Sequence, residues 1–324
     1  MLAPPPTDRH LPAADGIRGL ACLIVLVIHG ISFFWPASFP YLKGSGKYAV
    51  WLFFVLSAFL LAQGLQRRGL NKASLRDYAI SRSLRILPMF VVACVIYYVA
   101  GVGITSQEQL WAVLSLEQGT IHLWTIAVEF KFYLLLPFIL WAALQLQGRY
   151  GNSALLVGAA VLVLGQQYLW PYWLTPENSP LTLWYLPTFI FGVLAGLLQP
   201  QLRAHPVKHL ASAFALLTLA LLIIAIPGVR AWLFGPPLDT NLADKHLYLG
   251  LLWALFIALL VDGQSLAGRL LSSRPLTFLG TVSYSTYLIH WLIMVYFAKH
   301  WPQQPLALAA AISLSIAIGT AGHH

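Results

Sequence analysis

The sequence contains little charge, since Asp, Glu, Lys and Arg make up only 9% of its 324 residues. Soluble globular domains carry about 25%. Hydrophobic residues make up 59%, and the mean hydropathy is +0.75. A water-soluble fold of this size needs far more polar surface, so the composition excludes one and favours an integral membrane protein. The 12 Trp and 14 Tyr suit the two interfaces of a bilayer, where aromatic side chains collect.

Cysteine is also scarce. The only two, Cys22 and Cys94, both fall within hydrophobic runs. Two isolated cysteines exclude a disulfide framework and lack the spacing of a metal site, so we expect buried, unreactive thiols and no metal.

The net charge of +9 suggests a nucleic-acid partner. However, the basic residues lie in loops between apolar runs, which favours a role in membrane topology and no nucleic-acid binding.

Ten apolar runs approach the roughly 20 residues that a membrane-spanning helix needs. We therefore predict an all-α integral membrane protein with about ten transmembrane helices, forming a single domain over residues 1–324 with no fused soluble domain. The predicted spans are Ile17–Phe34, Tyr48–Leu65, Leu87–Ile104, His122–Leu146, Ser153–Trp170, Leu183–Leu198, Leu210–Ile226, Leu247–Val261, Leu276–Ala298 and Leu306–Ala321.

The positions of lysine and arginine predict the orientation. If the N-terminus is cytoplasmic, most basic residues lie inside: Arg9, Arg18, Arg67, Arg68, Lys72, Arg76, Arg82, Arg85, Arg149, Arg203, Lys208, Arg269 and Arg274. Only Lys43, Lys47, Arg230, Lys245 and Lys299 lie outside. Because basic residues gather on the cytoplasmic side of membrane proteins, we expect both termini to be cytoplasmic. His323 and His324 are given no role.

Ionisable residues inside the predicted spans are costly and are therefore functional candidates. His29, Glu129 and His290 lie on three different spans, at depths of about 8, 10 and 12 Å from the outer ends at 1.5 Å per residue. This common layer predicts a shared polar cavity in the outer half of the membrane. For each histidine the alternative is a structural hydrogen bond between helices. Lys131 points away from Glu129 on its helix.

Helical spacing adds further candidates. Arg18 and His29 share one face about 16 Å apart, and Asp15 lies one turn before Arg18. Ser283, Tyr287 and His290 form a stripe on one predicted helix, as do Glu129 and Tyr133. The predicted loop 66–86 carries six basic residues: Arg67, Arg68, Lys72, Arg76, Arg82 and Arg85. Paired guanidinium groups bind phosphate well, and the alternative is attraction to anionic lipid.

Five segments together resemble the membrane acyltransferase-3 family, whose members O-acylate surface polysaccharides, peptidoglycan and small molecules in bacteria. They are DGIRGLACLIVLVIHG (Asp15–Gly30), FFVLSAFLL (Phe53–Leu61), SRSLRILPMF (Ser81–Phe90), HLWTIAVEFKFYLLLP (His122–Pro137) and SYSTYLIHW (Ser283–Trp291). The resemblance covers nearly the whole chain. It implies a ten-helix membrane fold in the bacterial inner membrane that takes an acyl group from cytoplasmic acyl-CoA and needs no metal.

The resemblance also implies roles for residues. His29 matches the family's essential first-helix histidine, Arg18 its arginine, Arg82 and Arg85 the pair linked to the coenzyme's phosphates, and Glu129 the fourth-helix glutamate. The sequence departs from the family pattern at Ala58, usually glycine, and at Phe130 and Lys131, usually Glu and Gln. Some members carry a fused hydrolase-like domain, for which we expect no room here.

We therefore predict an O-acyltransferase that moves an acyl group from acyl-CoA to a hydroxyl of a surface glycan, an exopolysaccharide or a related acceptor. By family frequency the group is acetyl, with succinyl or longer chains left open. The main alternative is a proton-coupled transporter or flippase, although no repeated halves are visible.

In the predicted site, His29 is the general base and Glu129 orients it or carries its proton. A covalent acyl-histidine stage is left open. Arg18, Arg82, Arg85, Arg67 and Arg68 bind the donor. Asp15, Ser57, Tyr133, Ser283, Tyr287 and His290 are candidate pocket residues. The acceptor and the oligomeric state cannot be predicted from these residues.

Overall fold

The computed structural model describes residues 11–204, 210–235 and 245–322, and within these ranges the chain is helical with no β-strand. The class predicted from composition is thus confirmed. The helices are α1 (Ala14–Phe34), α2 (Phe39–Leu42), α3 (Lys47–Arg68), α4 (Lys72–Ala100), α5 (Gln107–Leu114), α6 (Trp124–Leu169), α7 (Thr182–Ala204), α8 (Ala211–Ala225), α9 (Pro227–Phe234), α10 (His246–Leu260), α11 (Leu266–Leu271), α12 (Arg274–His300) and α13 (Pro305–Ala321), with 3₁₀ turns at Pro36–Ser38 and Tyr172–Leu174.

Six of the described helices are long and apolar enough to cross a membrane, or seven if the bent pair α8 and α9 is one span. The chain is therefore a multi-pass membrane protein. α10 and α13 are apolar but have only 15 and 17 residues. The count of ten spans and the cytoplasmic termini stay predictions. Of the residues used for orientation, Arg9 and Lys208 lie outside the described residues, as do His323 and His324.

The structure corrects the loop predicted over residues 66–86. Helix α4 begins at Lys72 and runs unbroken through Pro88 to Ala100. Asn71 caps its first turn, because its side chain accepts a hydrogen bond from the Ser74 backbone N–H at 3.0 Å. The predicted span began only at Leu87, because the six basic residues before it interrupt the apolar run. Arg82 and Arg85 thus stand on a rigid helix.

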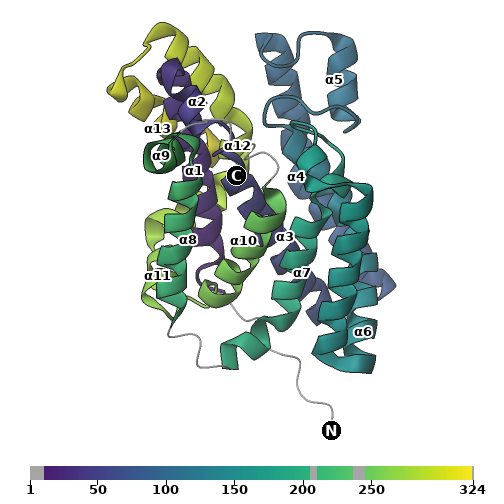
Figure 1. Cartoon of the computed structure of the whole chain (residues 1–324). Coiled ribbons are helices and arrows are strands. Elements are labelled where there is room, and N and C mark those ends of the chain that lie inside the picture. Colours follow the sequence, from purple (N-terminus) through teal and green to yellow (C-terminus); the bar gives the residue numbers. More distant parts are fainter. Residues whose placement is uncertain (1–10, 205–209, 236–244, 323–324) are drawn as a thin grey trace.

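The fourth and fifth predicted spans form one long element, α6, which is broken at Gly151. That glycine has a φ of 78°, in the left-handed region that side-chain-bearing residues avoid, and so it separates two helical halves. Both halves belong to α6, so the two predicted spans are counted as one candidate among the six membrane-spanning helices. Residues 105–121, between the third and fourth predicted spans, contain the short helix α5, which lies at the same end of the molecule as α2 (Figure 1).

The closest packing joins α1 to α12, two helices far apart in the sequence (Figure 1). Glycines at the crossing make it possible: a side chain on Gly19 would meet the backbone of Leu276, and one on Gly280 would meet the backbone of Asp15. In a membrane, where burying apolar surface gives helices little reason to associate, such backbone approach supplies the packing. It brings the His29 and His290 helices side by side.

Helix α3 forms the centre of the bundle and packs against α1, α7 and α10. Its large side chains Trp51, Phe54 and Phe59 are almost completely buried. Helix α3 also contacts α4 and α6, and a cavity with a partly polar lining opens between these helices.

Candidate active site

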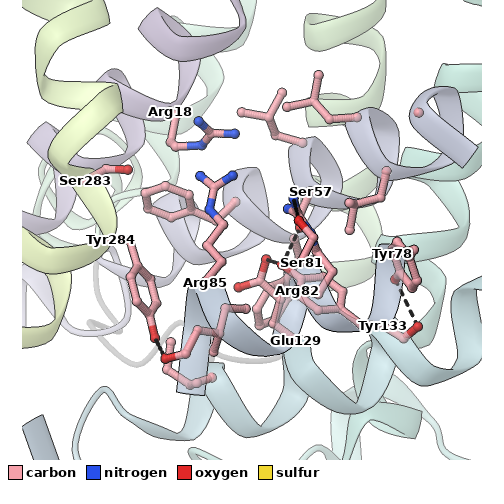
Figure 2. A pocket seen from close by; sticks show the side chains of 18 of the residues that line it. Arg18, Ser57, Tyr78, Ser81, Arg82, Arg85, Glu129, Tyr133, Ser283 and Tyr284 are labelled. Carbon is pink, nitrogen blue, oxygen red and sulfur yellow. Dashed lines mark hydrogen bonds between the residues drawn. The ribbon is translucent and has the colours of Figure 1, made fainter. Parts of the chain in front are cut away.

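A cavity of about 350 Å³ lies among α1, α3, α4, α6 and α12. Polar side chains from all five helices face it (Figure 2). Those the sequence had marked as candidates are Arg18, Ser57, Arg67, Arg68, Arg82, Arg85, Glu129, Tyr133, Ser283 and Tyr287. Residues as far apart in the sequence as Arg18 and Tyr287 therefore meet in one space, whereas of the predicted layer of His29, Glu129 and His290 only Glu129 lines it.

Guanidinium groups dominate one part of this cavity. Figure 2 shows Arg18 of α1 and Arg85 of α4 turned toward one another, with Arg82 beside them. Arg18 binds Asp15 at 2.8 Å. For Arg82 and Arg85, in contrast, no carboxylate within 4 Å is found among the described residues. Arg82 and Arg85 thus bring two positive charges to the cavity wall with no carboxylate at ion-pair distance among the described residues.

Two tyrosines fix the helix that carries Arg82 and Arg85. The Tyr78 hydroxyl of α4 donates to the Tyr133 carbonyl of α6 at 2.9 Å. The Tyr284 hydroxyl of α12 donates to the Ile86 carbonyl of α4 at 2.8 Å. α4 is thus bound to a neighbouring helix on each side of its arginines. Because hydrogen bonds of this kind hold backbones in register, the guanidinium groups have a defined place on the wall.

Glu129 is the final acceptor of a short chain of hydrogen bonds. The Tyr133 hydroxyl donates to the Glu129 carboxylate at 2.5 Å, and the Ser57 and Tyr133 hydroxyl oxygens are 3.0 Å apart. A carboxylate can only accept hydrogen bonds, so the Tyr133 hydroxyl donates its hydrogen to Glu129. The Ser57 hydroxyl therefore donates to the Tyr133 oxygen. The chain therefore runs in one direction, from α3 to α6, along the cavity wall (Figure 2).

The structure brings His29 together with His290 rather than with Glu129. His29 Nδ1 lies 2.9 Å from His290 Nε2, and no hydrogen bond joins His29 to Glu129 among the described residues. Glu129 is one helical turn beyond Thr125, whose hydroxyl contacts Tyr287 at 3.1 Å. Glu129 thus lies about 6 Å further along α6 than that contact, so the common depth expected from span boundaries was too coarse.

Neither histidine lines the cavity, whereas Tyr287 does. The Tyr287 ring is 5.5 Å from the ring of His290, so one side chain separates the cavity from the histidine pair. Asp15 is also absent from the lining and instead binds Arg18. Lys131, as expected from its place on the helix, points elsewhere and donates to the carbonyls of Leu116 and Pro180.

Sequence reasoning missed several residues of the cavity wall. Tyr78 and Ser81 precede Arg82 and Arg85 on one face of α4, and Tyr284 follows Ser283 on α12. A helix-face reading of residues 72–86 finds Tyr78 and Ser81 at once, since they share the i, i+3, i+4 and i+7 positions with the arginines. That reading was excluded by the assignment of the segment as a loop.

The fold and the cavity define a multi-pass membrane protein with an arginine-lined cavity beside a hydrogen-bonded pair of histidines, His29 and His290. The model of a family described as an acyltransferase domain matches residues 11–323. The chain belongs to this family, the acyltransferase-3 family, and the acyltransferase class expected from its motifs is confirmed at this level. No metal-binding group of three or more His, Cys, Asp or Glu occurs in the described part of the chain.

Curated relatives come from several bacteria. The chain is 26% identical to "Peptidoglycan O-acetyltransferase OatA" of Listeria monocytogenes, over 88% of this chain and 50% of the relative. It is 26% identical to "Putative peptidoglycan O-acetyltransferase YrhL" of Bacillus subtilis, over 89% of this chain and 49% of the relative. It is 25% identical to "Putative O-acetyltransferase SACOL0978" of Staphylococcus aureus, over 90% of this chain and 52% of the relative. The chain spans about half the length of these relatives. No solved structure matches it.

Proposed function

We propose that the chain is an O-acyltransferase of the bacterial cytoplasmic membrane that takes an acetyl group from acetyl-CoA and passes it to a hydroxyl of a glycan. Peptidoglycan is the acceptor class to test first, because two relatives carry it in their names. Exopolysaccharide and other surface glycans are the further acceptors of the same chemistry. The donor, the acceptor and the roles of individual residues are parts of this proposal.

The observation that carries it is the group of arginines on the cavity wall. Arg67, Arg68, Arg82 and Arg85 all line the cavity, and among the described residues none has a carboxylate within 4 Å. Arg18 adds a fifth guanidinium from the facing helix. An acyl-CoA carries several phosphate charges at one end of a long thin arm. Guanidinium groups bind such phosphates with paired, charge-assisted hydrogen bonds.

The rest of the cavity suits the arm of the donor. Pantetheine contains two amides, which need hydrogen-bond partners once they leave water. Ser57, Tyr133, Glu129 and Ser283 line the cavity together with apolar side chains and supply polar groups for these amides. In this proposal Glu129 accepts from an amide N–H and keeps Tyr133 and Ser57 in place. The thioester then lies at the far end, beside Thr125 and Tyr287.

His29 is the proposed general base at that end. Its Nε2 lone pair takes the proton of the acceptor hydroxyl while the oxygen attacks the thioester carbonyl. The carbon–sulfur bond breaks, the acetyl group stays on the acceptor oxygen, and the leaving thiolate takes the proton back from Nε2. Val50 lines the cavity one turn of α3 after Gly46, where an added Cβ would lie 3.1 Å from His29 Nε2, and this supports a base close to the donor cavity.

The transporter or flippase alternative finds no support in the comparisons, since the family and the named relatives are acyltransferases. The same cavity with a bound anion would fit either class by shape alone. What separates the two is chemistry, because a transporter leaves the thioester intact. The test is therefore a chemical one.

The experiment uses the full chain in proteoliposomes with acetyl-CoA labelled on its acetyl group and with peptidoglycan fragments as acceptor. We expect release of free CoA thiol and labelled fragments. Acetyl-CoA at 100 times its dissociation constant should also stabilise the protein by about 2.7 kcal/mol. His29→Ala should abolish thiol release but keep the stabilisation. Arg76→Ala is the matched control, since Arg76 is exposed and does not line the cavity.

Two results would overturn the proposal. One is the absence of any stabilisation by acetyl-CoA, which would show that acetyl-CoA is not the donor. The other is thiol release by His29→Ala at the rate of the unchanged protein, which would show that His29 is not the general base. Transfer of label to a different glycan, with none to peptidoglycan fragments, would replace only the acceptor.

A further inference from the structure

His290 was expected to be a pocket residue, but it lies behind His29. Its side chain is completely buried, with 0% exposure, whereas His29 remains partly exposed. It does not line the cavity. A group in this position cannot touch donor or acceptor, so any part that it plays in the reaction is exerted through His29.

The hydrogen bonds of His290 determine which of its nitrogens carries the proton. Its Nδ1 lies 2.6 Å from the Tyr287 backbone carbonyl. A carbonyl only accepts, so Nδ1 carries the hydrogen and, in the neutral ring, Nε2 carries the lone pair. That Nε2 lies 2.9 Å from His29 Nδ1. His29 must therefore donate from Nδ1, and its own lone pair is on Nε2.

The geometry of the two rings agrees with a direct hydrogen bond. Their planes differ by only 4°, with ring centres 5.3 Å apart. Trp291 packs edge-on against His29 at 5.1 Å, and His122 packs against His290 at 4.9 Å. His29 is thus held by one hydrogen bond and by an aromatic wall, which leaves little freedom for its ring to rotate.

The lone pair of His29 points toward the start of α3. Nε2 lies 3.1 Å from the place that a Cβ on Gly46 would occupy. Gly46 has φ −61° and ψ −25°, ordinary helical angles that any residue can adopt. The backbone therefore does not require glycine here, and the absence of a side chain serves to leave space in front of the nitrogen.

We infer that His290 is a positioning residue that holds His29 in the tautomer with its lone pair on Nε2, and that Gly46 keeps the approach to that nitrogen open for the acceptor hydroxyl. This inference rests on the proposed function of His29. It assigns to a neutral histidine the part that a carboxylate plays in catalytic triads, namely to orient the base and fix its tautomer.

Three variants test the positioning role in the proteoliposome assay. In His290→Leu the acceptor for His29 Nδ1–H is lost, and a misdirected base should lower kcat by about 10²-fold. The KM for acetyl-CoA should change less than about threefold, because the arginine cavity is untouched. In His290→Gln the amide oxygen can accept from His29, so kcat should recover to within about tenfold of the unchanged protein. Gly46→Ala should lower kcat with the same unaltered KM.

His300→Leu is the matched control. His300 lies on the same helix and its Nδ1 makes the same kind of bond to a backbone carbonyl, that of Tyr296 at 2.8 Å, but it has no histidine partner. Its kcat should be unchanged. Nitrogen-15 spectra of histidine-labelled protein give a second readout, since the two tautomers have distinct ring-nitrogen patterns. We expect the Nδ1–H form for His29, lost in His290→Leu.

The outcomes separate this inference from the proposed function. The positioning role of His290 is wrong if His29→Ala is inactive but His290→Leu retains full activity. It is also wrong if His29 shows the Nε2–H form. In both cases the assignment of His29 as the general base still stands. A His290→Gln variant that stays as inactive as His290→Leu, though equally folded by thermal unfolding, would also overturn it. If His29→Ala remains active, the proposed function itself fails.

Discussion

Removing one guanidinium group from the cavity should weaken the binding of acetyl-CoA. It should not weaken the binding of a fragment of acetyl-CoA that lacks the phosphates. Arg85→Ala takes away a charge that has no carboxylate within 4 Å among the described residues and that faces Arg18. A charge-assisted hydrogen bond contributes about 1.5–3 kcal/mol. At about 1.4 kcal/mol per factor of ten, this corresponds to about 10- to 150-fold in affinity.

The expected loss lies near the lower end of that range, because the substitution also removes repulsion between Arg85 and Arg18 in the empty cavity. At a separation of a few ångströms such repulsion amounts to about 1 kcal/mol or more even in water. We therefore expect acetyl-CoA to bind Arg85→Ala about tenfold more weakly. Acetyl-pantetheine, which has the arm and thioester but lacks the nucleotide phosphates, should bind both proteins equally.

The assay is titration of each ligand into the full chain in detergent, at low and at moderate salt. Salt screens exposed charges, so affinity for acetyl-CoA should fall as ionic strength rises, and less steeply in Arg85→Ala. Arg76→Ala, an exposed arginine on the same helix, should leave both affinities unchanged. Equal weakening of acetyl-CoA and acetyl-pantetheine would refute the reasoning, since it would show that Arg85 shapes the cavity without contacting phosphate.

Three further outcomes are expected. Gly280→Ala should lower stability by about 1–3 kcal/mol in thermal unfolding, because the added methyl would meet the Asp15 backbone, whereas Gly148→Ala, with open space around it, should not. Tyr133→Phe leaves Glu129 without its donor and should cost about 1–3 kcal/mol as well as acetyl-CoA affinity; an unchanged unfolding midpoint would argue against the hydrogen-bond chain. Cys22 and Cys94, both buried, should resist maleimide until the protein unfolds, and rapid labelling of folded protein would contradict this.

Much of the protein could be predicted from the sequence because a membrane permits few solutions. In hydrocarbon every backbone polar group must be paired within its own segment, so long apolar runs form helices. The runs around His29, Ser57 and His290 became α1, α3 and α12 nearly as expected. The spacing of Arg82 and Arg85, one helical turn apart, likewise predicted a paired anion site whether or not the segment was a helix.

Local signals were ambiguous where charge and proline coincide. Residues 72–86 look like a loop by composition, yet they continue α4, since Tyr78 and Ile86 are held to neighbouring helices by hydrogen bonds that only the folded bundle provides. The depth argument had the same weakness. It placed Glu129 level with His29 from span boundaries, but a shift of one turn is enough to move a side chain into a different group of partners.

The sequence by itself therefore determined the class of fold, the family and most of the polar residues in the cavity, because hydropathy and helical spacing are local properties. The tertiary structure alone decided the partners: His29 and His290 are 261 residues apart, and Glu129 binds Tyr133 and not His29. Glycines at the crossing of α1 and α12 set that pairing through close backbone contact. The direction of each hydrogen bond, and with it the reactive nitrogen of His29, depends on which groups the fold brings within reach.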